Sequence, residues 1–526
     1  MSGELNVLNH HNPNLLSVYG LLEMADKAFS NKEAIYDLKR RIAFSEIKRD
    51  ADKLAAALAK RGINKGDRVA IALPNWYETI VVFFAVAKIG ATLVPFNPMY
   101  KAYEVHFILK NSEPKAVFVT EEFRKNNHLK ELLFDVPIVI SVRFEGNDFI
   151  PYQQLVAKSQ TELEQTSIDA QNDVFCILYT SGTTGVPKGV MITHEAIVKS
   201  ALTLATELKY TENDVLILPS PLFHIFGMAV NLFCAVSFGS RIVLLERFQP
   251  QEVFSLIEQE QVSILNGVPT MFIKLLETEN FDDFNLTSLR TGIVGASPIP
   301  ASKVKEIRDR LGINLCQSFG ITETVTVTMT PYEDEERNIT ETLGRPIPGV
   351  ELKIVDENRI TLPAGETGEI AIKGFGTMKG YYQLPDQTAA VLDNDGWFYS
   401  GDLGVLNEKG YLTFVGRKKE MIIRGGFNIY PGEIEAVLAK HPKVVESAVI
   451  GLPDQTLGEI VCAIIKLKSG NVCTEEEIIS YLKEHIAIFK VPQMVIFTDA
   501  FPVTASGKIQ KLKLREEIGA NISRTI

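Results

Sequence analysis

The stretch that decides the fold is VFCILYTSGTTGVPKGV, residues 174–190. It begins and ends as an apolar, strand-like run, and between the two runs it concentrates glycine, hydroxyl-bearing residues and one lysine. Glycines let backbone N–H groups turn inward around an anion, the hydroxyls add donors, and the lysine adds positive charge. The stretch therefore predicts a polyphosphate-binding loop made by Thr180, Ser181, Gly182, Thr183, Thr184, Gly185 and Lys188.

This loop differs from the Walker A loop. The GxxxxGK[ST] spacing fails, because Pro187 stands where the second glycine belongs and Gly189 follows Lys188. Residues 174–178 and 190–192 both look like strands, so the loop joins strand to strand and no helix N-terminus supports it. A glycine-rich hairpin without a ligand is the alternative for a bare TSG tripeptide, and the length of the whole stretch favours the phosphate loop.

Length, composition and charge narrow the class of protein. A chain of 526 residues predicts about three domains. With 46% hydrophobic and 23% charged residues it can bury a large core. The net charge of −11 disfavours nucleic acid and anionic membrane surfaces as main partners. The first residues carry neither a basic start nor an apolar segment, so no signal peptide is expected.

The cysteines and one long uncharged stretch indicate in which cellular compartment the protein is expected. The five cysteines are odd in number, far apart and without metal-ligand spacing, which is typical of reduced core residues in a cytoplasmic protein. Residues 215–240 carry no formal charge and are long enough to be tested as a membrane span. Pro219, Pro221 and Gly227 interrupt them, so we expect a buried strand, a loop and a core helix, and no transmembrane segment.

Strand and helix patterns alternate over the first 210 or so residues, which is typical of a doubly wound α/β fold. Ser45 is expected to cap an amphipathic helix that ends at Gly62. A second α/β set follows, and residues 350–414 then show short segments of period two, which indicate a small β subdomain. The strands and helices of the first set are expected at residues 69–73, 79–89, 92–95, 103–111 and 116–120.

The pattern changes again after Gly416, where a basic run leads to a pair of glycines. Strands are expected at residues 446–450 and 461–467, helices at 432–440 and 474–485, and then a polar tail. The prediction is therefore an α/β protein with a large N-terminal domain, residues 1–416, built from two doubly wound α/β subdomains and a small β subdomain. A small α+β C-terminal domain, residues 417–526, completes it.

YTSGTTGVPKGV resembles the signature of the AMP-forming acyl-adenylate superfamily, which includes acyl-CoA synthetases, adenylation domains of peptide synthetases, and luciferases. Further motifs of that superfamily follow in its order, so the resemblance extends from about residue 20 to 515. They are GASPI (295–299), QSFGITET (317–324), GRPIPG (344–349), YSGDLG (399–404), GRKKEMIIRGGFNIYPGEIE (416–435) and PVTASGKIQK (502–511).

The resemblance implies roles for the residues of QSFGITET. Phe319 stacks on adenine in place of the usual tyrosine, so a contact from the tyrosine hydroxyl is absent here. Thr322 contacts the α-phosphate, and Glu323 and Thr183 bind Mg²⁺. The remaining expected nucleotide contacts are Gln317, Ser318 and Gly320, with Gly295 and Ala296 as a wall between adenine and acyl group.

The later motifs imply the parts that act in turn. Asp402 accepts the two ribose hydroxyls, as a carboxylate does well, and Arg417 holds ribose or phosphate. Lys419 is the hinge of a mobile C-terminal domain. Lys508 is the adenylation lysine, which approaches the carboxylate and α-phosphate in one step and withdraws in the next. The turn of Gly425, Gly426 and Phe427 lines the face that forms the thioester.

PLFHIFGM, residues 221–228, bears on the substrate. Amino-acid-activating relatives place an aspartate near here to pair with the substrate's ammonium, and burying an unpaired ammonium is costly. Since this stretch offers no carboxylate, amino acids are disfavoured. We expect His224 to close an apolar acyl tunnel lined by Phe223, Phe226, Met228, Val268, Met271 and Phe272. Considered singly, each of these apolar residues can equally be an ordinary core residue.

The predicted function is an ATP-dependent acid:CoA ligase for a medium- or long-chain fatty acid, using ATP, Mg²⁺ and CoA and passing through an acyl-AMP. An aryl or hydroxycinnamate CoA ligase and an enzyme that loads an acyl carrier protein are alternatives. A luciferase-like oxygenase has no specific support, and a non-enzymatic binding protein would have lost Lys508, Glu323 or Asp402. The natural acid, the pathway and the choice between monomer and homodimer stay open.

Overall fold

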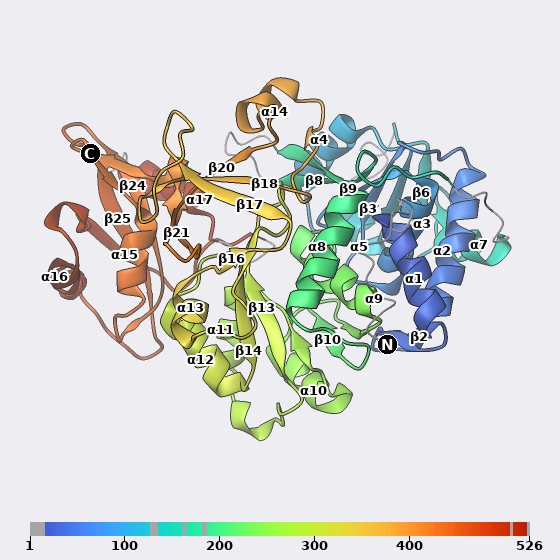
Figure 1. Cartoon of the computed structure of the whole chain (residues 1–526), viewed down its shortest axis with the longest axis horizontal. Coiled ribbons are helices and arrows are strands. Elements are labelled where there is room, and N and C mark those ends of the chain that lie inside the picture. Colours follow the sequence, from blue (N-terminus) through green and yellow to red (C-terminus); the bar gives the residue numbers. More distant parts are fainter. Residues whose placement is uncertain are drawn as a thin grey trace.

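The computed structural model describes residues 16–126, 135–159, 163, 166–180, 187–504 and 509–522. The chain is a mixed α/β protein with a large N-terminal part and a separate C-terminal domain (Figure 1). The N-terminal part runs from blue through green and yellow to the orange of α14 (Pro385–Val391) in Figure 1, and the C-terminal domain, in darker orange and red, lies at one end of the long axis.

The first sheet has eight strands in the order β19-β9-β8-β4-β3-β5-β6-β7. Its middle strands are parallel, and β8, β9 and β19 pair antiparallel at one edge. The strands are β3 (Arg68–Ala72), β4 (Thr92–Pro95), β5 (Ala116–Val119), β6 (Ile138–Ser141), β7 (Ile150–Pro151), β8 (Val174–Thr180), β9 (Lys188–Thr193) and β19 (Gly380–Tyr381).

Of the helices described in this half, the sequence predicted α2, α3 and α4 and missed α1, α5 and α7. Helix α3 is buried on nearly all faces and ends at Gly90, whose φ of +75° favours glycine. Ser45 is not the cap of α2, because the N-cap is Ala43, whose N–H donates to Glu46 Oε2 at 3.0 Å. The helices are α1 (Val18–Phe29), α2 (Phe44–Ala59), α3 (Tyr77–Ile89), α4 (Ala102–Ser112), α5 (Glu121–Asn126) and α7 (Tyr152–Lys158).

The second sheet has nine strands in the order β16-β15-β14-β13-β12-β10-β11-β1-β2. Strand β1, from the N-terminal region, pairs with β11 through Ile35 and Ile242, so the chain start completes a sheet made mostly of later residues. The strands are β1 (Glu33–Tyr36), β2 (Arg41–Ala43), β10 (Val215–Leu218), β11 (Arg241–Leu244), β12 (Ile264–Leu265), β13 (Thr291–Gly295), β14 (Asn314–Phe319), β15 (Thr328–Met329) and β16 (Arg345–Pro346).

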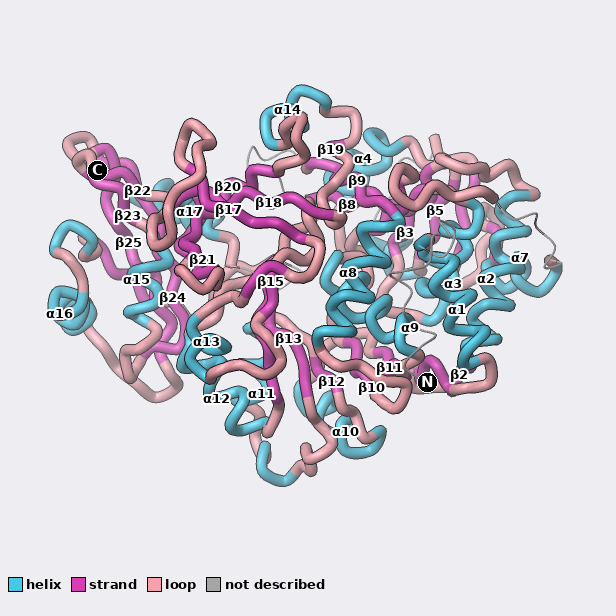
Figure 2. Tube along the Cα trace, viewed as in Figure 1, coloured by secondary structure: helices cyan, strands magenta, loops and turns pink. Residues whose placement is uncertain are grey.

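Helices α1, α8 and α9 lie between the two sheets (Figure 2), where one continuous cluster of buried apolar side chains joins them. Residues 215–240 form β10, a loop, the π-helix η3 and α9, as predicted, and no helix within the described part of the chain has the length and apolarity to cross a bilayer. The remaining helices are α8 (His194–Glu207), η3 (Phe226–Phe233), α9 (Cys234–Phe238), α10 (Pro250–Glu260), α11 (Pro269–Leu276), η4 (Phe281–Asp283), α12 (Ala301–Leu311), α13 (Glu336–Glu341) and α14 (Pro385–Val391).

A four-stranded antiparallel sheet follows, as the period-two pattern of residues 350–414 predicted. Its outer strands are β17 and β21, and β20 lies beside β21 with Asp402 opposite Arg417. The strands are β17 (Val350–Val355), β18 (Gly368–Gly374), β20 (Phe398–Leu406) and β21 (Leu412–Arg417).

The C-terminal domain has its own five-stranded sheet and its own buried core. The predicted polar tail is wrong in part: β26 adds a parallel strand to β25, and α17 packs Leu514 against the sheet. The elements are η5 (Lys418–Glu420), β22 (Ile422–Arg424), β23 (Phe427–Ile429), α15 (Pro431–Leu438), β24 (Val444–Asp454), β25 (Gly458–Leu467), α16 (Glu475–His485), η6 (Ile488–Lys490), β26 (Met494–Phe497) and α17 (Lys511–Ile522).

Candidate active site

The predicted phosphate loop connects two antiparallel strands, as expected. Thr180 at the end of β8 pairs with Lys188 at the start of β9, so both stand at the mouth of the loop. Ser181, Gly182, Thr183, Thr184 and Gly185 lie outside the described residues, and the roles predicted for them stay predictions. The described part therefore places Thr180 and Lys188 opposite each other at the loop ends of β8 and β9.

Gln317 and Ser318 are held by the fold at the end of β14. The Ser318 hydroxyl donates to the carbonyl of Thr328 at 3.0 Å, and the Gln317 amide donates from Nε2 to three carbonyls. Those carbonyls belong to Ile339, Thr340 and Thr342. These bonds fix β14, the strand that carries Phe319, whose side chain is 8% exposed. Because Gln317 Nε2 and the Ser318 hydroxyl donate within the protein, a nucleotide would have to contact other atoms of these two residues.

Glu323 and Lys188 both contact Tyr381, a residue that the sequence did not indicate. The Tyr381 hydroxyl donates to Glu323 Oε1 at 3.0 Å, and the Lys188 ammonium lies over the Tyr381 ring, 4.8 Å from its centroid. The structure therefore brings the predicted magnesium ligand close to the lysine of the phosphate loop. The only local signal is a short tyrosine-containing strand after Gly380, which by itself does not indicate a site.

Asp402 and Arg417 form an ion pair next to Lys419. Arg417 Nε lies 3.2 Å from Asp402 Oδ1, and Asp402 is 5% exposed. Burial lowers the pKa of Lys419, and the positive charges of Arg417 and Lys188 lower it further, against smaller opposing effects of nearby carboxylates. Arg417 and Lys188 are therefore close enough to act on Lys419 electrostatically, as is typical of cations that gather around a polyanionic ligand.

Gly295 is the last residue of β13, beside β14, and Ala296 follows the strand. A Cβ added at Gly295 would lie 2.9 Å from the Ser318 carbonyl oxygen and 3.5 Å from the Phe226 ring, so only glycine fits this approach. Ala296 has a φ of +66°, a left-handed conformation that is uncommon for alanine. This turn thus separates the strand that carries Phe319 from the π-helix.

A small cavity opens beside the π-helix. Its volume is about 10 Å³, which is room for about one water molecule. Of the residues predicted for the acyl tunnel, Phe226, Val268 and Met271 line it together with His224, while Met228 and Phe272 are buried in the two large apolar cores. The other lining residues are Ser220, Pro221 and Gly227.

His224 lies two residues before the first residue of the π-helix, a rare conformation that is frequent at functional sites. Its Nδ1 accepts the N–H of Phe226 at 3.2 Å. Because Nδ1 is an acceptor in this bond, the proton of the neutral ring is on Nε2. The histidine is therefore oriented by the backbone of the helix that it precedes.

The predicted glycine turn belongs to the C-terminal domain. Gly425 and Gly426 have φ values of +55° and +86° between β22 and β23, and Phe427 after them is 55% exposed and stacks on Phe489. Lys508 lies outside the described residues. The base of its loop is fixed, because Val503 and Ile509 form an antiparallel bridge.

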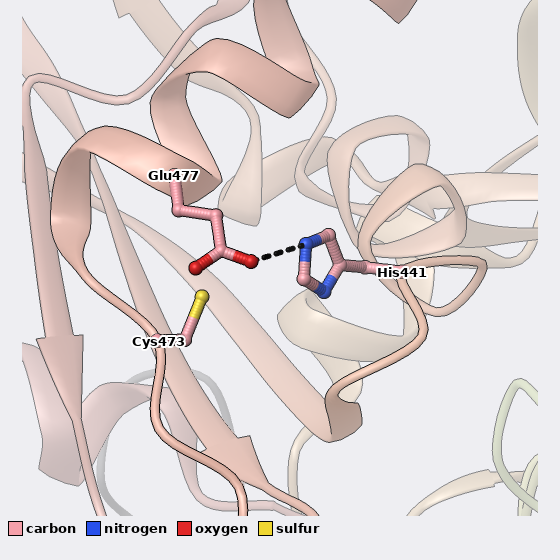
Figure 3. A group of neighbouring side chains, drawn as sticks. All are labelled: His441, Cys473 and Glu477. Atoms are coloured by element: carbon pink, nitrogen blue, oxygen red, sulfur yellow. Dashed lines mark ion pairs between the residues drawn. The ribbon is translucent and has the colours of Figure 1, made fainter.

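A second group of chemically active side chains lies in the C-terminal domain, where His441, Cys473 and Glu477 come together (Figure 3). The Lys443 ammonium binds Glu477 at 2.7 Å, and burial raises the pKa of the Cys473 thiol. The backbone N–H of Lys443 donates to His441 Nδ1 at 3.3 Å, which puts the proton of the neutral ring on Nε2, facing Glu477. A neutralised carboxylate, a thiol and a protonated nitrogen favour a structural cluster over a metal site.

Known proteins resemble the chain over nearly its full length. The profile of the AMP-binding enzyme family matches residues 22–382, and that of the AMP-binding enzyme C-terminal domain matches residues 433–508. YngI of Bacillus subtilis, provisionally named an acyl-CoA synthetase, is 37% identical over 94% of this chain and 96% of its own. The mitochondrial medium-chain acyl-CoA ligase ACSF2 of Macaca fascicularis is 34% identical over 95% of this chain and 87% of its own.

Among solved structures, MatB from Rhodopseudomonas palustris in its ATP-bound form has a TM-score of 0.88 at 31% identity, covering 95% of this chain and 99% of MatB. Apo MatB gives a TM-score of 0.78. The chain therefore belongs to the AMP-binding enzyme family, and it is an enzyme of the acyl-CoA synthetase type.

Proposed function

We propose that the chain is an ATP-dependent acid:CoA ligase that converts a medium- or long-chain fatty acid to its thioester through an acyl-AMP. The observation that carries this proposal is the grouping of Lys188, Arg417 and Lys419 with the carboxylates of Glu323 and Asp402. Such a set provides positive charge for phosphates, one carboxylate for a divalent cation and one for the ribose hydroxyls.

Glu323 is the proposed ligand of Mg²⁺, together with Thr183. Its carboxylate is half-buried and accepts a hydrogen bond from the neutral phenol of Tyr381, so its negative charge is retained for a cation. Oxygen ligands are the ones that Mg²⁺ prefers. Bound there, the ion would neutralise the polyphosphate, while Lys188 and Arg417 add charge from the hairpin and from the edge of β21.

Asp402 is the proposed ribose ligand. It is nearly buried, and Arg417 on the neighbouring strand holds its carboxylate in place. A carboxylate oriented in this way can accept both hydroxyls of a vicinal diol. Arg417, which is 39% exposed at its side chain, can then reach the ribose or the α-phosphate.

The two half-reactions are proposed to use two positions of the C-terminal domain, residues 417–526, about a hinge at Lys419. The separate core of this domain and the exposed Gly425–Gly426 turn support a unit that can move as a body. The closer similarity to ATP-bound than to apo MatB supports the arrangement for the first half-reaction. Lys508 would complete adenylation, and the glycine turn would then face the acyl-AMP for attack by CoA.

The proposed acid is fatty because the cavity beside His224 is lined mainly by apolar side chains, with no carboxylate to pair with an ammonium. The name of the relative ACSF2 also supports a medium-chain acid. Since the cavity holds about one water, an acyl chain enters only if side chains move aside, and the flexible Met271 is suited to this movement. We also propose a cytoplasmic location, which the five buried, unpaired cysteines support.

The test is pyrophosphate release from ATP and Mg²⁺ over a panel of fatty acids, hydroxycinnamates, benzoates and amino acids, each with and without CoA. Release that depends on a fatty acid, with the CoA thioester as product, is the expected result. Thioester formation from an aromatic acid alone would replace the fatty substrate by an aryl one. Release without a CoA thioester, followed by acylation of a carrier protein, would contradict CoA as the acceptor.

A further inference from the structure

Tyr381 contacts two proposed site residues with two different parts of its side chain. The hydroxyl donates to Glu323 Oε1 at 3.0 Å, and the ring face carries the Lys188 ammonium at 4.8 Å from its centroid. The residue is 7% exposed. Glu323, Lys188 and Tyr381 come from three separate segments of the chain, so this contact exists only in the folded protein.

The backbone around Tyr381 is attached to both of these segments. Met378 N–H donates to the Glu323 carbonyl at 2.7 Å, and Tyr382 N–H donates to the Gly189 carbonyl at 2.7 Å. Within β19, Tyr381 pairs with Val190 of β9. The segment is therefore attached on one side to the turn that carries Glu323 and on the other to the strand that begins with Lys188.

The turn itself is packed against this segment without spare room. A Cβ at Gly376 would lie 2.4 Å from the Thr324 carbonyl oxygen, so the chain passes the turn as closely as glycine allows. The Tyr381 N–H donates to the Thr388 hydroxyl at 2.9 Å, which fixes the residue from the side of α14. The position of the phenol is thus set by its backbone and not by its contact with Glu323 alone.

The two contacts have complementary chemistry. A carboxylate has about four lone-pair sites, so one phenol bond orients Glu323 and leaves sites for a cation. A phenol is protonated at neutral pH and a carboxylate can only accept, so the Tyr381 hydroxyl is the donor in this bond. The ring attracts the Lys188 ammonium but carries no negative charge. A carboxylate partner would neutralise the ammonium, whereas with the ring its full positive charge remains for a phosphate.

We propose that Tyr381 is a positioning residue that fixes the Glu323 carboxylate for Mg²⁺ with its hydroxyl and the Lys188 ammonium for the polyphosphate with its ring. This inference rests on the proposed function, because it assigns Mg²⁺ and ATP to Glu323 and Lys188. It predicts that loss of the hydroxyl reduces the gain in nucleotide affinity due to Mg²⁺. Loss of the ring should in addition lower the nucleotide affinity measured without Mg²⁺.

The test compares Tyr381→Phe, which removes only the hydroxyl, with Tyr381→Leu, which also removes the ring. ATP affinity is measured by calorimetry without any acid substrate, once with Mg²⁺ and once with excess EDTA. We expect Tyr381→Phe to reduce the gain in affinity due to Mg²⁺ by about 10-fold, as for loss of one hydrogen bond to a charged group. Affinity in EDTA should be unchanged in Tyr381→Phe and lower in Tyr381→Leu.

Tyr411→Phe is the matched control. The Tyr411 hydroxyl donates to Asp334 Oδ2 at 2.6 Å, and its ring carries the Arg345 guanidinium at 4.2 Å, so it has the same two kinds of contact away from the proposed site. This variant should bind ATP as the wild type does with and without Mg²⁺. An equal loss in Tyr411→Phe would mean a general structural effect and would overturn the proposal, as would an unchanged magnesium gain in Tyr381→Phe.

The same experiment separates this inference from the proposed function. If the wild type binds ATP, gains affinity with Mg²⁺ and releases pyrophosphate with a fatty acid, the function stands whatever Tyr381→Phe does. If the wild type shows no magnesium-dependent ATP binding, the proposed function fails first and the inference with it. The midpoint of thermal unfolding is measured for all three variants. Midpoints close to that of the wild type exclude misfolding as the cause of a loss in affinity.

Discussion

Asp402 and Arg417 face each other across strands β20 and β21, with Arg417 Nε 3.2 Å from Asp402 Oδ1. The carboxylate is nearly buried and the guanidinium is partly exposed, so the pair presents an oriented acceptor beside a cation that solvent can reach. This arrangement suits the ribose diol and the neighbouring phosphate that we propose bind here.

Asp402→Asn should weaken ATP binding by about 10- to 100-fold, because one carboxylate then no longer accepts two hydroxyls, a loss of roughly 1.5–3 kcal/mol. Calorimetric titration with ATP measures it. Asp334→Asn removes a carboxylate that the Tyr411 hydroxyl binds elsewhere, and it should leave ATP affinity unchanged. Equal affinity of Asp402→Asn and the wild type would exclude Asp402 as the ribose ligand.

Lys508→Ala should reduce acid-dependent pyrophosphate release by orders of magnitude, because a positive charge on the reacting carboxylate and α-phosphate is lost. Thioester formation from supplied acyl-AMP should survive. Lys513→Ala, which removes an exposed lysine of α17, is the control and should behave as the wild type. Parallel loss of both half-reactions in Lys508→Ala would sink the assignment.

Lys419→Pro should have the opposite effect, since proline fixes φ at the proposed hinge. Pyrophosphate release should persist at the level of Lys419→Ala, which lacks the same positive charge, and thioester formation from supplied acyl-AMP should be lost. Lys419→Ala removes the same ammonium while keeping φ free, so it should retain the second half-reaction. The two half-reactions are assayed separately, and normal thioester formation by Lys419→Pro would rule out a pivot at this residue.

Burial lowers the pKa of His194 to about 4 from its ordinary value of 6.5, and its Nδ1 accepts the N–H of Val18 at 3.3 Å. Between these pH values the unfolded chain binds the proton and the folded chain does not, so stability falls as pH falls from 6.5 through 4. The full loss is about 3 kcal/mol for this residue.

His194→Asn keeps a side-chain acceptor but cannot titrate in this range. The difference in urea midpoint between pH 7 and pH 5 should therefore be smaller in His194→Asn than in the wild type. His485→Asn, at an exposed histidine, serves as the comparison and should keep the wild-type difference. If His194→Asn loses as much stability as the wild type on acidification, a buried neutral His194 is excluded.

Lys511 joins α17 to the segment around the proposed hinge, with its ammonium 2.6 Å from Glu435 Oε1 and 3.6 Å from Glu420 Oε2. Lys511→Met would leave these carboxylates without their cation. We expect the C-terminal domain to lose about 2 kcal/mol of unfolding free energy, since the group is largely buried.

The control is Lys513→Met. Lys513 lies two residues after Lys511 in α17, is exposed and pairs with Glu517. It should cost less than about 0.5 kcal/mol, as exposed pairs usually do. Urea unfolding followed by circular dichroism compares the two variants. Equal costs would show that the Lys511 contacts add nothing beyond an ordinary surface ion pair.

Local patterns were sufficient for much of the fold. The hairpin of β8 and β9 follows from two apolar runs around a glycine-rich loop, and α3 with its Gly90 end follows from composition and capping. Sequence reasoning failed at the cap of α2, because Glu46 and not Ser45 supplies the cap. It also missed α17, whose apolar contacts with the sheet depend on few side chains, such as Leu514.

The sequence by itself determined the hairpin of β8 and β9, the order of motifs and the alternation of strand and helix, because each depends on residues close together in the chain. Only the tertiary structure decided which distant residues meet. Tyr381 reaches Glu323 across 58 positions, and β1 completes a sheet with β11. Such contacts depend on how whole elements pack, since a side chain's periodicity indicates which face is buried but not which partner covers it.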